Sequence, residues 1–323
     1  MANTCYKSLK STGKPHHYRQ PNVTMTQKIL ITGGKGQLGQ SFQWLNSRAP
    51  LSTKLQLTSR QELDICDRKS IERALAHHQP TVVINAAAYT AVDKAESEPD
   101  LAYAINAHAV ELLASACAHR GIRFIHISTD YVFDGHGAQA YAEDAPTAPN
   151  NIYGKSKLAG EQAALATLAN SIILRTSWIF SQFGNNFLTT MLKLATERDS
   201  LQIVNDQIGG PSYAPAIAKV LLQLAVHPQA QGVYHFAGSP RVSWFEFAQA
   251  IFQAAQERQL LKRVPCLTPI STIDYRTPAN RPAQSALSME RLHQLDIGYN
   301  NNWHEGIQAS LSALYTPALH ISP

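Results

Sequence analysis

Short apolar runs alternate with longer helical patterns along the first half of the chain. Runs rich in β-branched residues predict strands at 28–32, 54–58, 81–85, 123–128 and 171–175. Apolar residues at helical spacing predict helices at 38–45, 68–78, 100–119 and 153–169. Nearly continuous apolar strands separated by helices are typical of a parallel sheet that is covered on both faces. The alternation therefore predicts an α/β fold with a doubly wound parallel sheet.

The alternation loosens after residue 176, where prolines and glycines become frequent, as in Gly209-Gly210-Pro211. We interpret residues 28–175 as the sheet domain, to which later segments return, and 176–323 as mainly a smaller mixed α/β substrate lobe. The sequence has no long linker between the two parts, so we expect them to pack closely and to share a cleft. In open α/β sheets, ligands bind beyond the carboxyl ends of the strands.

The positive charge of the chain is concentrated at its start. The chain has 28 basic and 23 acidic residues, and residues 1–28 hold five of the basic residues and no acid. Without these five, 23 basic residues face 23 acidic ones, so we do not expect a basic face that binds nucleic acid. Residues 1–27 are expected to be a flexible basic leader, because they have neither the apolar core of a secretory signal nor the amphipathic period of a transit peptide.

Other features give no sign of a membrane or a metal. No run of 18 apolar residues is present, so we expect no membrane span. The cysteines at 5, 66, 117 and 266 form no C-x-x-C pair, and His77-His78 has no acid or cysteine at ligand spacing. We therefore predict a cytoplasmic protein with reduced thiols and no metal site.

A glycine-rich turn follows the first predicted strand directly. Its pattern is Gly33-x-x-Gly36-x-x-Gly39, and it opens a helix. Glycines allow a tight turn and a close approach of the backbone to a pyrophosphate, while the helix start offers free N–H groups to the anion. The motif is weak by itself, but the strand before it and the helix after it favour dinucleotide binding on a Rossmann-type sheet. The wide spacing of the first two glycines is similar to that of short-chain dehydrogenases/reductases.

The end of the second strand is informative about the cofactor. An acid there would bind the ribose 2′-hydroxyl of NAD, whereas an arginine accommodates the 2′-phosphate of NADP. The run Leu57-Thr58-Ser59-Arg60 has no acid, so we predict that Arg60 favours NADPH. NADH remains an alternative, because Arg60 could also be a solvated surface residue. Asp64 is expected to face the adenine.

A tyrosine and a lysine stand four residues apart at the start of the helix that follows the fourth strand. The i,i+4 spacing places Tyr153 and Lys157 on one helix face. A nearby ammonium would lower the phenol pKa and make Tyr153 a usable acid or base. Lys157 could also hold the nicotinamide ribose. Thr129, at the end of the fourth strand, could donate a hydrogen bond to a carbonyl oxygen. These three residues are the predicted catalytic group.

Several longer motifs carry a family resemblance that spans residues 28–315. They are Asn85-Ala86-Ala87-Ala88-Tyr89-Thr90-Ala91-Val92-Asp93-Lys94-Ala95-Glu96, Ser128-Thr129-Asp130-Tyr131-Val132-Phe133, Tyr153-Gly154-Lys155-Ser156-Lys157-Leu158-Ala159-Gly160-Glu161, Arg175-Thr176-Ser177-Trp178, Gly184-Asn185-Asn186-Phe187, Asn205-Asp206-Gln207-x-Gly209-x-Pro211 and Arg281-Pro282. In these segments the chain resembles the dTDP-4-dehydrorhamnose reductases, a branch of the extended short-chain dehydrogenases/reductases.

The resemblance implies that hydride from NADPH reduces the C4 keto group of dTDP-4-dehydro-β-L-rhamnose, the last step of dTDP-L-rhamnose synthesis. It implies that Tyr153 protonates the alkoxide, Thr129 polarises the carbonyl and Lys157 positions the cofactor. The cofactor site would further include Gly33, Gly36, Gln37, Leu38, Gly39, Arg60, Asp64, Ile65, Ala86, Ala87 and Ala88. The substrate would be bordered by Thr90, Thr129, Asp130, Tyr131, Trp178, Asn186 and Arg281. Trp178 could equally be a core aromatic residue and Arg281 a solvated loop residue.

One departure from the family pattern bears on assembly. Some members dimerise around magnesium held by acidic residues, and the corresponding positions here are Ser41 and Pro215, which supply no carboxylate. We therefore expect no metal site and a monomer or weak homodimer, although magnesium is associated with this family type.

Two other functions are compatible with parts of the pattern. Epimerases and dehydratases for nucleotide sugars share the Thr, Tyr and Lys, but the dehydratases have Asp-Glu after the threonine, where this chain has Asp130-Tyr131. A non-catalytic, NADP-binding regulatory relative would tolerate loss of the Tyr or the Lys, and both are present here.

Overall fold

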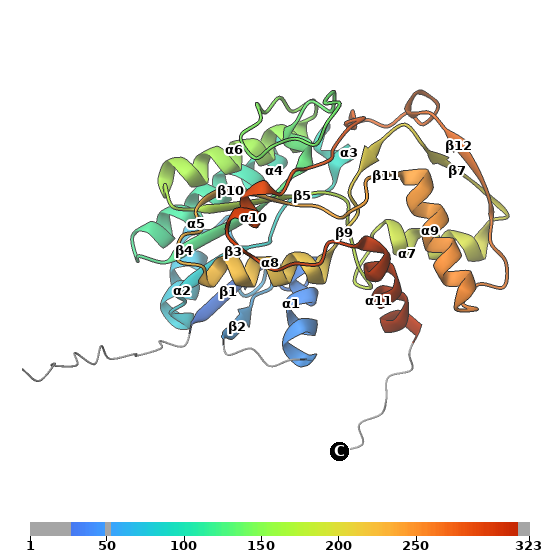
Figure 1. Cartoon of the computed structure of the whole chain (residues 1–323). Coiled ribbons are helices and arrows are strands. Elements are labelled where there is room, and N and C mark those ends of the chain that lie inside the picture. The colour runs from blue at the N-terminus through green and yellow to red at the C-terminus, as the bar shows by residue number, and fades with distance from the viewer. Residues whose placement is uncertain (1–26, 49–52, 316–323) are drawn as a thin grey trace, which may run out of the picture.

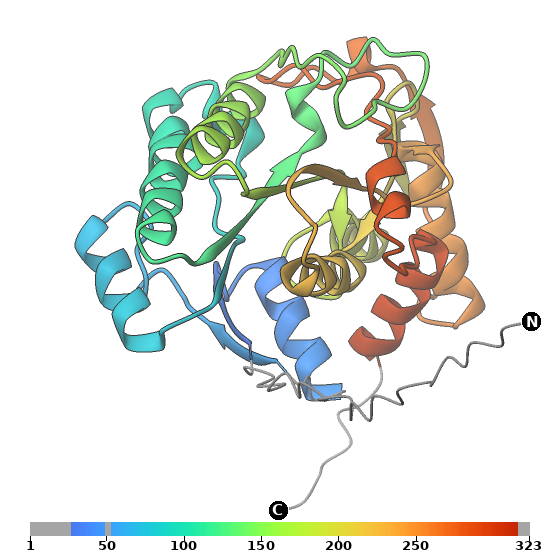
Figure 2. The same ribbon diagram turned by 60° about the vertical axis from the view of Figure 1, so that its left-hand side comes forward.

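The computed structural model describes residues 27–48 and 53–315, and it is built on a six-stranded parallel sheet (Figures 1 and 2). The strand order is β10-β5-β4-β3-β1-β2, and every neighbouring pair is parallel. The strands are β1 (Lys28–Thr32), β2 (Lys54–Leu57), β3 (Val82–Asn85), β4 (Arg123–Thr129), β5 (Ile172–Thr176) and β10 (Gly232–Phe236). The predicted fold class is confirmed. The predicted leader lies outside the described residues except for Gln27.

Helices cover both faces of the sheet (Figure 2). On one face lie α1 (Gln37–Arg48) and α8 (Ala214–Val226); on the other lie α2 (Arg68–His78), α5 (Ala109–Ala118) and α6 (Ile152–Thr167). The strands supply both cores because successive side chains alternate between the faces. In β1, for example, Ile29 and Ile31 pack in the core with α1 and α8, whereas Leu30 packs in the core with α2 and α5.

The predicted helix at 100–119 is a continuous but irregular run. It consists of α4 (Pro99–Tyr103), a π-helical stretch η1 (Ala104–His108) and α5. By length and mean hydropathy alone, Pro99–Ala118 could cross a membrane, although it contains no run of 18 apolar residues. Half of this run is buried inside the fold, and it packs against α6 and β4. A core helix passes the same test of length and hydropathy.

The second half of the chain builds most of a smaller lobe with its own core. This core lies among α7 (Phe187–Glu197), α9 (Trp244–Glu257), α11 (Trp303–Tyr315), β7 (Ser200–Val204) and β12 (Cys266–Ile270). Its short elements include β6 (Ile179–Phe180), β8 (Ile208–Gly209), β9 (Ser212–Tyr213), β11 (Val242–Ser243) and η3 (Thr272–Asp274). The short helix α10 (Glu290–Gln294) instead packs against β10, with Leu292 in the core beside α1 and α8. The same half contributes α8 and β10 to the sheet, so the two parts are interleaved in sequence.

Two short helices that the sequence did not predict lie at the carboxyl end of the sheet. They are α3 (Val92–Ala95), after β3, and the 3-10 turn η2 (Asp130–Val132), after β4.

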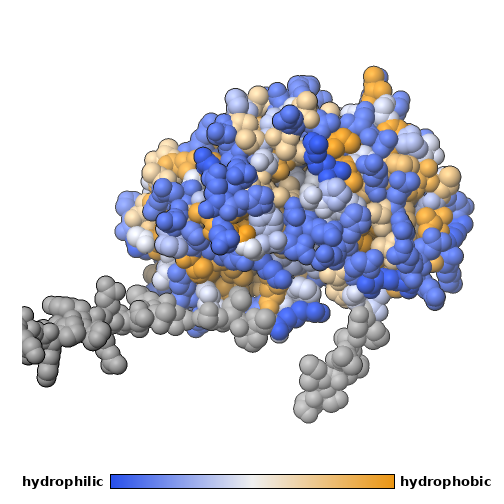
Figure 3. All heavy atoms as spheres, viewed as in Figure 1, coloured by the Kyte–Doolittle hydropathy of each residue, from blue (hydrophilic) through white to orange (hydrophobic). Residues whose placement is uncertain are grey.

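On the face shown in Figure 3, hydrophilic residues predominate and apolar ones are scattered among them, as on most folded proteins.

Candidate active site

A cavity of about 490 Å³ opens at the carboxyl end of the sheet. It brings together residues from β4, α1, α6, the loop after β3 and the segment after β5, and most of them are predicted site residues. Of the predicted residues, the cavity is lined by Gln37, Leu38, Ala86, Ala87, Ala88, Thr90, Thr129, Asp130, Tyr131, Tyr153, Lys157 and Trp178. The sequence analysis did not single out Val92, Ile127, Ser128, Thr176, Ile179, Gly184 and Asn185, which line it as well.

A second cavity, of about 240 Å³, adjoins the first through the loop that follows β3. Ala86, Ala87 and Ala88 line both cavities. The second cavity is further lined by Gly33, Arg60, Leu63, Asp64, Ile65, Cys66 and Ile105. All predicted cofactor residues except Gly36 and Gly39 thus line one of two adjoining cavities, which suits an extended ligand with two bulky ends.

The glycine turn fits tightly between these hollows. Gly33 has φ +68°, and a Cβ placed on it would lie 2.9 Å from the backbone of Ala86 and Ala87. Only glycine tolerates both the backbone conformation and the contact. Gly36 lies in the same turn, where its N–H donates to the carbonyl of Gly33 at 2.9 Å, and Gly39 lies in the first turn of α1. A tight glycine turn directly before the N-terminus of α1 is suited to binding the pyrophosphate of a dinucleotide.

Arg60 lies on the solvent side of the smaller cavity. Its side chain is 76% exposed, and its Nε lies 3.8 Å from Oδ2 of Asp64. An exposed ion pair at this distance is weak, so Arg60 remains free to move toward a ligand phosphate.

The predicted catalytic threonine and tyrosine lie close together in the larger cavity. The Thr129 hydroxyl donates to Oδ1 of Asp130 at 2.9 Å, and the Tyr153 ring meets the ring of Tyr131 edge to face at 5.6 Å. Burial raises the pKa of Tyr153 to about 12, while a hydrogen bond with Thr129 acts in the opposite direction. Burial also raises the pKa of Asp130, to about 6.

The expected lowering of the tyrosine pKa by Lys157 is not what the structure shows. The Nζ of Lys157 donates to the carbonyl of Ile127 at 2.7 Å and lies 3.1 Å from Nε2 of His126. The lysine head thus contacts strand β4 in place of the phenol, and desolvation then dominates the pKa of Tyr153. Burial lowers the pKa of Lys157 itself to about 8, against an opposing effect of Glu161.

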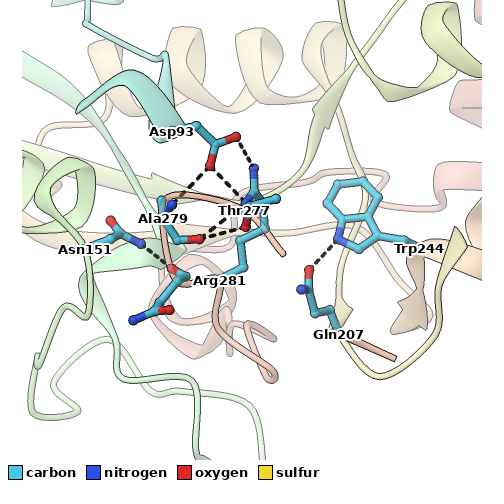
Figure 4. Close-up of polar contacts among 8 residues, drawn as sticks. Asp93, Asn151, Gln207, Trp244, Thr277, Ala279 and Arg281 are labelled. Atoms are coloured by element: carbon cyan, nitrogen blue, oxygen red, sulfur yellow. Dashed lines mark hydrogen bonds and ion pairs between the residues drawn. The ribbon is translucent and has the colours of Figure 1, made fainter. Parts of the chain in front are cut away.

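The start of α6 is fixed from several directions, which sets the placement of Tyr153 and Lys157. The side chain of Asn151 accepts from the N–H of Gly154 at 2.7 Å and donates to the carbonyl of Asn280, also at 2.7 Å (Figure 4). Asn106, in the π-helical stretch, donates to the Ser156 hydroxyl and to the carbonyl of Tyr89. The same amide therefore connects α6 to the loop after β3.

Trp178 lies just after the carboxyl end of β5 and is packed against a second tryptophan. Its φ of +45° is unusual for a bulky residue, and its indole stacks on that of Trp244 with ring centroids 3.5 Å apart. Trp244 is itself fixed, because its Nε1 donates to Oε1 of Gln207 at 3.1 Å (Figure 4). The sequence analysis missed Trp244, since no spacing connects residues 178 and 244. Trp178 is therefore both a packed aromatic residue and part of the cavity wall.

Two predicted substrate residues do not line the cavity that contains Thr129, Tyr153 and Lys157. Arg281 lines a third cavity, of about 800 Å³, and its Nη2 pairs with Oδ2 of Asp93 at 2.8 Å (Figure 4). Asn186 caps α7 by accepting from the N–H of Thr189, and its amide donates to the carbonyl of Ser181 at 2.8 Å. The polar atoms of both side chains are thus engaged within the protein, and their contact with a substrate stays a prediction.

The residues present do not fit a structural magnesium. Ser41 is fully buried and its hydroxyl donates to the carbonyl of Gln37, while Pro215 is buried in α8. Within residues 27–48 and 53–315, no group of three or more His, Cys, Asp or Glu side chains could hold a metal ion.

Comparison with known proteins identifies the family. Residues 27–316 match the family described as the RmlD substrate binding domain. A dTDP-4-dehydrorhamnose reductase of Aggregatibacter actinomycetemcomitans is 43% identical over 286 residues, which cover 87% of this chain and 97% of the relative. The dTDP-4-dehydrorhamnose reductase of Escherichia coli K12 is 38% identical over 296 residues, 89% of this chain and 98% of the relative.

A solved structure extends the likeness to three dimensions. The dTDP-4-dehydrorhamnose reductase from Bacillus anthracis, in complex with NADP, is 35% identical and matches with a TM-score of 0.83 over 90% of this chain and all of that chain. The motifs at the carboxyl end of the sheet, the full-length sequence similarity and the shared fold agree: the chain belongs to the dTDP-4-dehydrorhamnose reductase family.

Proposed function

We propose that this protein uses NADPH to reduce the C4 keto group of dTDP-4-dehydro-β-L-rhamnose, giving dTDP-β-L-rhamnose. The observation that carries the proposal is the cavity that gathers Thr129, Tyr153 and Lys157 beside the loop against which the glycine turn is packed. Such a cavity places a proton donor next to a nicotinamide site, which is what carbonyl reduction requires.

The two adjoining cavities suggest how the cofactor would be placed. The turn at Gly33 and the start of α1 would hold the pyrophosphate, and Arg60 would meet the 2′-phosphate. Asp64, Ile65 and the alanines Ala86–Ala88 would line the adenosine half and the middle of the cofactor. NADPH supplies the hydride when it is bound there.

Side chains of the protein would polarise the C4 carbonyl and supply the proton to its oxygen. Thr129 would turn its hydroxyl from Asp130 toward the substrate carbonyl and polarise it. Because its pKa is raised, Tyr153 stays protonated at neutral pH and can give its phenolic proton to the oxygen at C4. Trp178 would offer an apolar face to the deoxysugar. Thr90, Asp130 and Tyr131 would border the sugar, with Asn186 and Arg281 toward the nucleotide.

We further propose that the enzyme acts in the cytoplasm as a monomer or weak homodimer, with a nucleotide sugar as its ligand and no nucleic-acid or membrane partner. The balanced charge after residue 28 and the missing carboxylates at positions 41 and 215 support this. Beyond residue 28, the anionic ligand would rely on local donors because the net charge is zero.

Tyr153→Phe tests the catalytic role. Loss of the proton donor should lower kcat about 10²- to 10⁴-fold, with little change in NADPH affinity. Turnover would be followed as NADPH oxidation, and the product identified by mass spectrometry and NMR. Tyr234→Phe is the matched control, because Tyr234 is a buried tyrosine of β10 outside the cavities lined by the predicted catalytic and cofactor residues. NADPH binding without turnover of the keto sugar by the wild type would contradict the proposal.

A further inference from the structure

A row of buried polar side chains crosses the sheet behind the candidate active site. Thr32 of β1 pairs in register with Asn85 of β3, and Asn85 pairs with His126 of β4. The three side chains are 0–1% exposed and point to the face covered by α6, where Lys157 lies. Polar residues are costly in a sheet core unless they are hydrogen-bonded, so the row calls for an explanation.

The contacts form an unbroken chain that ends at the lysine. The Oγ1 of Thr32 accepts from the N–H of Ala87 at 3.1 Å and donates to Oδ1 of Asn85 at 2.6 Å. The Nδ2 of Asn85 lies 3.1 Å from Nδ1 of His126, and Nε2 of His126 lies 3.1 Å from Nζ of Lys157. The chain thus runs from the loop that lines both cofactor cavities to Lys157.

The orientation of the Asn85 amide determines which ring nitrogen of His126 carries the hydrogen. Because Thr32 donates to the amide oxygen of Asn85, the amide nitrogen faces His126, and Nδ1 must accept. A neutral imidazole then carries its hydrogen on Nε2, pointing at Lys157. An uncharged lysine amine can accept this hydrogen with its lone pair while donating to Ile127; an ammonium has no lone pair. All partners are satisfied when Lys157 is neutral.

Protonation of Lys157 reverses the direction of its hydrogen bond with His126. The ammonium can only donate, so Nε2 of His126 must accept and the imidazole hydrogen must move to Nδ1. Lys157 takes up one proton from the bulk solvent and the ring stays neutral throughout. Asn85 then has to turn its oxygen toward His126 and its nitrogen toward Thr32, and the Thr32 hydroxyl loses its acceptor.

We propose that His126 is a positioning residue for Lys157, which holds Nζ on β4 and couples the charge of the lysine to its own tautomer through Asn85 and Thr32. This inference rests on the proposed role of Lys157 in the reductase. Its consequence is that above about pH 8 the resting site contains a largely neutral amine, which spares the buried site an uncompensated ammonium.

Other charged groups near the pair have their own partners. On α6, Glu161 forms a buried ion pair with Arg175 of β5, with Oε2 and Nη2 2.7 Å apart, and Tyr153 lies one turn before the lysine. Asp130 at the end of β4 accepts from Thr129. Burial and the nearby Lys157 hold the pKa of His126 well below its usual value, so the ring does not itself become charged. Burial lowers the pKa of Lys157 to about 8.

The direct test is the tautomer of His126 in the free protein. In ¹⁵N-labelled full-length protein, long-range ¹H–¹⁵N spectra report which imidazole nitrogen carries the hydrogen. The signal of His126, one of 13 histidines, is assigned by its absence in His126→Gln. We expect a neutral ring with the hydrogen on Nε2 above about pH 8, changing to Nδ1 as the pH falls. Lys157→Met should abolish this change. The same tautomer at pH 6 and pH 10 in the wild type would overturn the proposal.

Kinetics supply the second readout. Asn85→Asp places a carboxylate where Nδ1–H can donate, so it favours the ammonium and should shift the pH profile of kcat upward by about one unit. Thr32→Val is the milder variant if a buried carboxylate disturbs folding, and should shift the profile in the same direction by less. His126→Gln should lower kcat about tenfold with KM little changed. Unchanged pH profiles in all three variants would count against the coupling.

His235→Gln is the matched control, because His235 is equally buried but lies in β10, near Arg175, and lines neither cofactor cavity. Its pH profile should match the wild type. The tautomer measurement needs no substrate, so it can fail or succeed independently of turnover of the proposed keto sugar.

Discussion

At the scale of single residues, burial sets the charge of the site more strongly than neighbouring charges do. The pKa of Tyr153 is raised and the pKa of Lys157 is lowered, and desolvation is the largest cause of both shifts. Both shifts favour the uncharged form. A phenol that stays protonated is the form that a reductase needs at the start of the reaction, because the substrate oxygen takes up a proton.

Arg60 is the residue whose role in cofactor choice is most easily tested. Arg60→Ala should raise the KM for NADPH about tenfold and leave the KM for NADH nearly unchanged, since only NADPH carries the 2′-phosphate. Steady-state kinetics with both cofactors give the comparison. Arg73→Ala serves as the control, because Arg73 is similarly exposed and pairs with Asp67 away from the cavities. An equal effect on both cofactors would refute the assignment.

At the scale of elements, the start of α6 is the part of the fold on which the chemistry depends. The helix approaches the turn η2 so closely that a Cβ on Gly154 would lie 2.2 Å from the carbonyl oxygen of Tyr131. Tyr153 lies next to that contact and Lys157 one turn beyond it. The position of both predicted catalytic side chains is therefore set by a backbone-to-backbone contact.

Gly154→Ala should push α6 away from η2. We expect a loss of about 1–3 kcal/mol in the free energy of unfolding, as for other overpacked sites, and a kcat that falls by more than the folded fraction does. Urea unfolding and turnover at a temperature where the variant is folded would measure the two effects. Gly298→Ala is the control, because a Cβ there meets nothing within 4 Å. A fully active and stable Gly154→Ala protein would disprove the close contact.

At the scale of the whole molecule, the two parts of the chain are joined across the candidate site. Asp93 lies on α3, beside the sheet, while Arg281 belongs to the segment that follows η3 (Figure 4). Their ion pair is partly exposed, with the side chains 39% and 23% exposed, and the N–H of Ala279 also donates to Asp93. This ion pair has two candidate roles. It could hold the segment after η3 against α3, or it could orient Arg281 to bind an anionic ligand.

Two variants separate these roles. If Arg281 binds the nucleotide sugar, Arg281→Ala should raise its KM about tenfold or more, whereas Asp93→Asn, which keeps the arginine, should change it little. The KM for NADPH should stay constant in both, because neither residue lines the cofactor cavities. Equal increases in both variants would show that the ion pair acts only as a fastening between the two parts.

Much of this protein was predictable from the sequence because the signals are local. The order of strands and helices, the turn at Gly33 and the placement of Tyr153 and Lys157 on one helix face depend on residues within a few positions of one another. Boundaries were correct to within a few residues; α2, for instance, spans Arg68–His78 as expected. Family membership followed from motifs that are each continuous in the chain.

The tertiary structure decided what no local pattern contains. Lys157 contacts His126, 31 residues earlier, instead of the phenol four residues away, because packing of α6 on β4 directs its head group to the strand. Arg281 meets Asp93 across 188 residues, which only the path of the later chain over the sheet allows. Strand register aligns Thr32, Asn85 and His126. Local residue preferences fix the elements, but the partners of each buried polar group depend on how those elements pack.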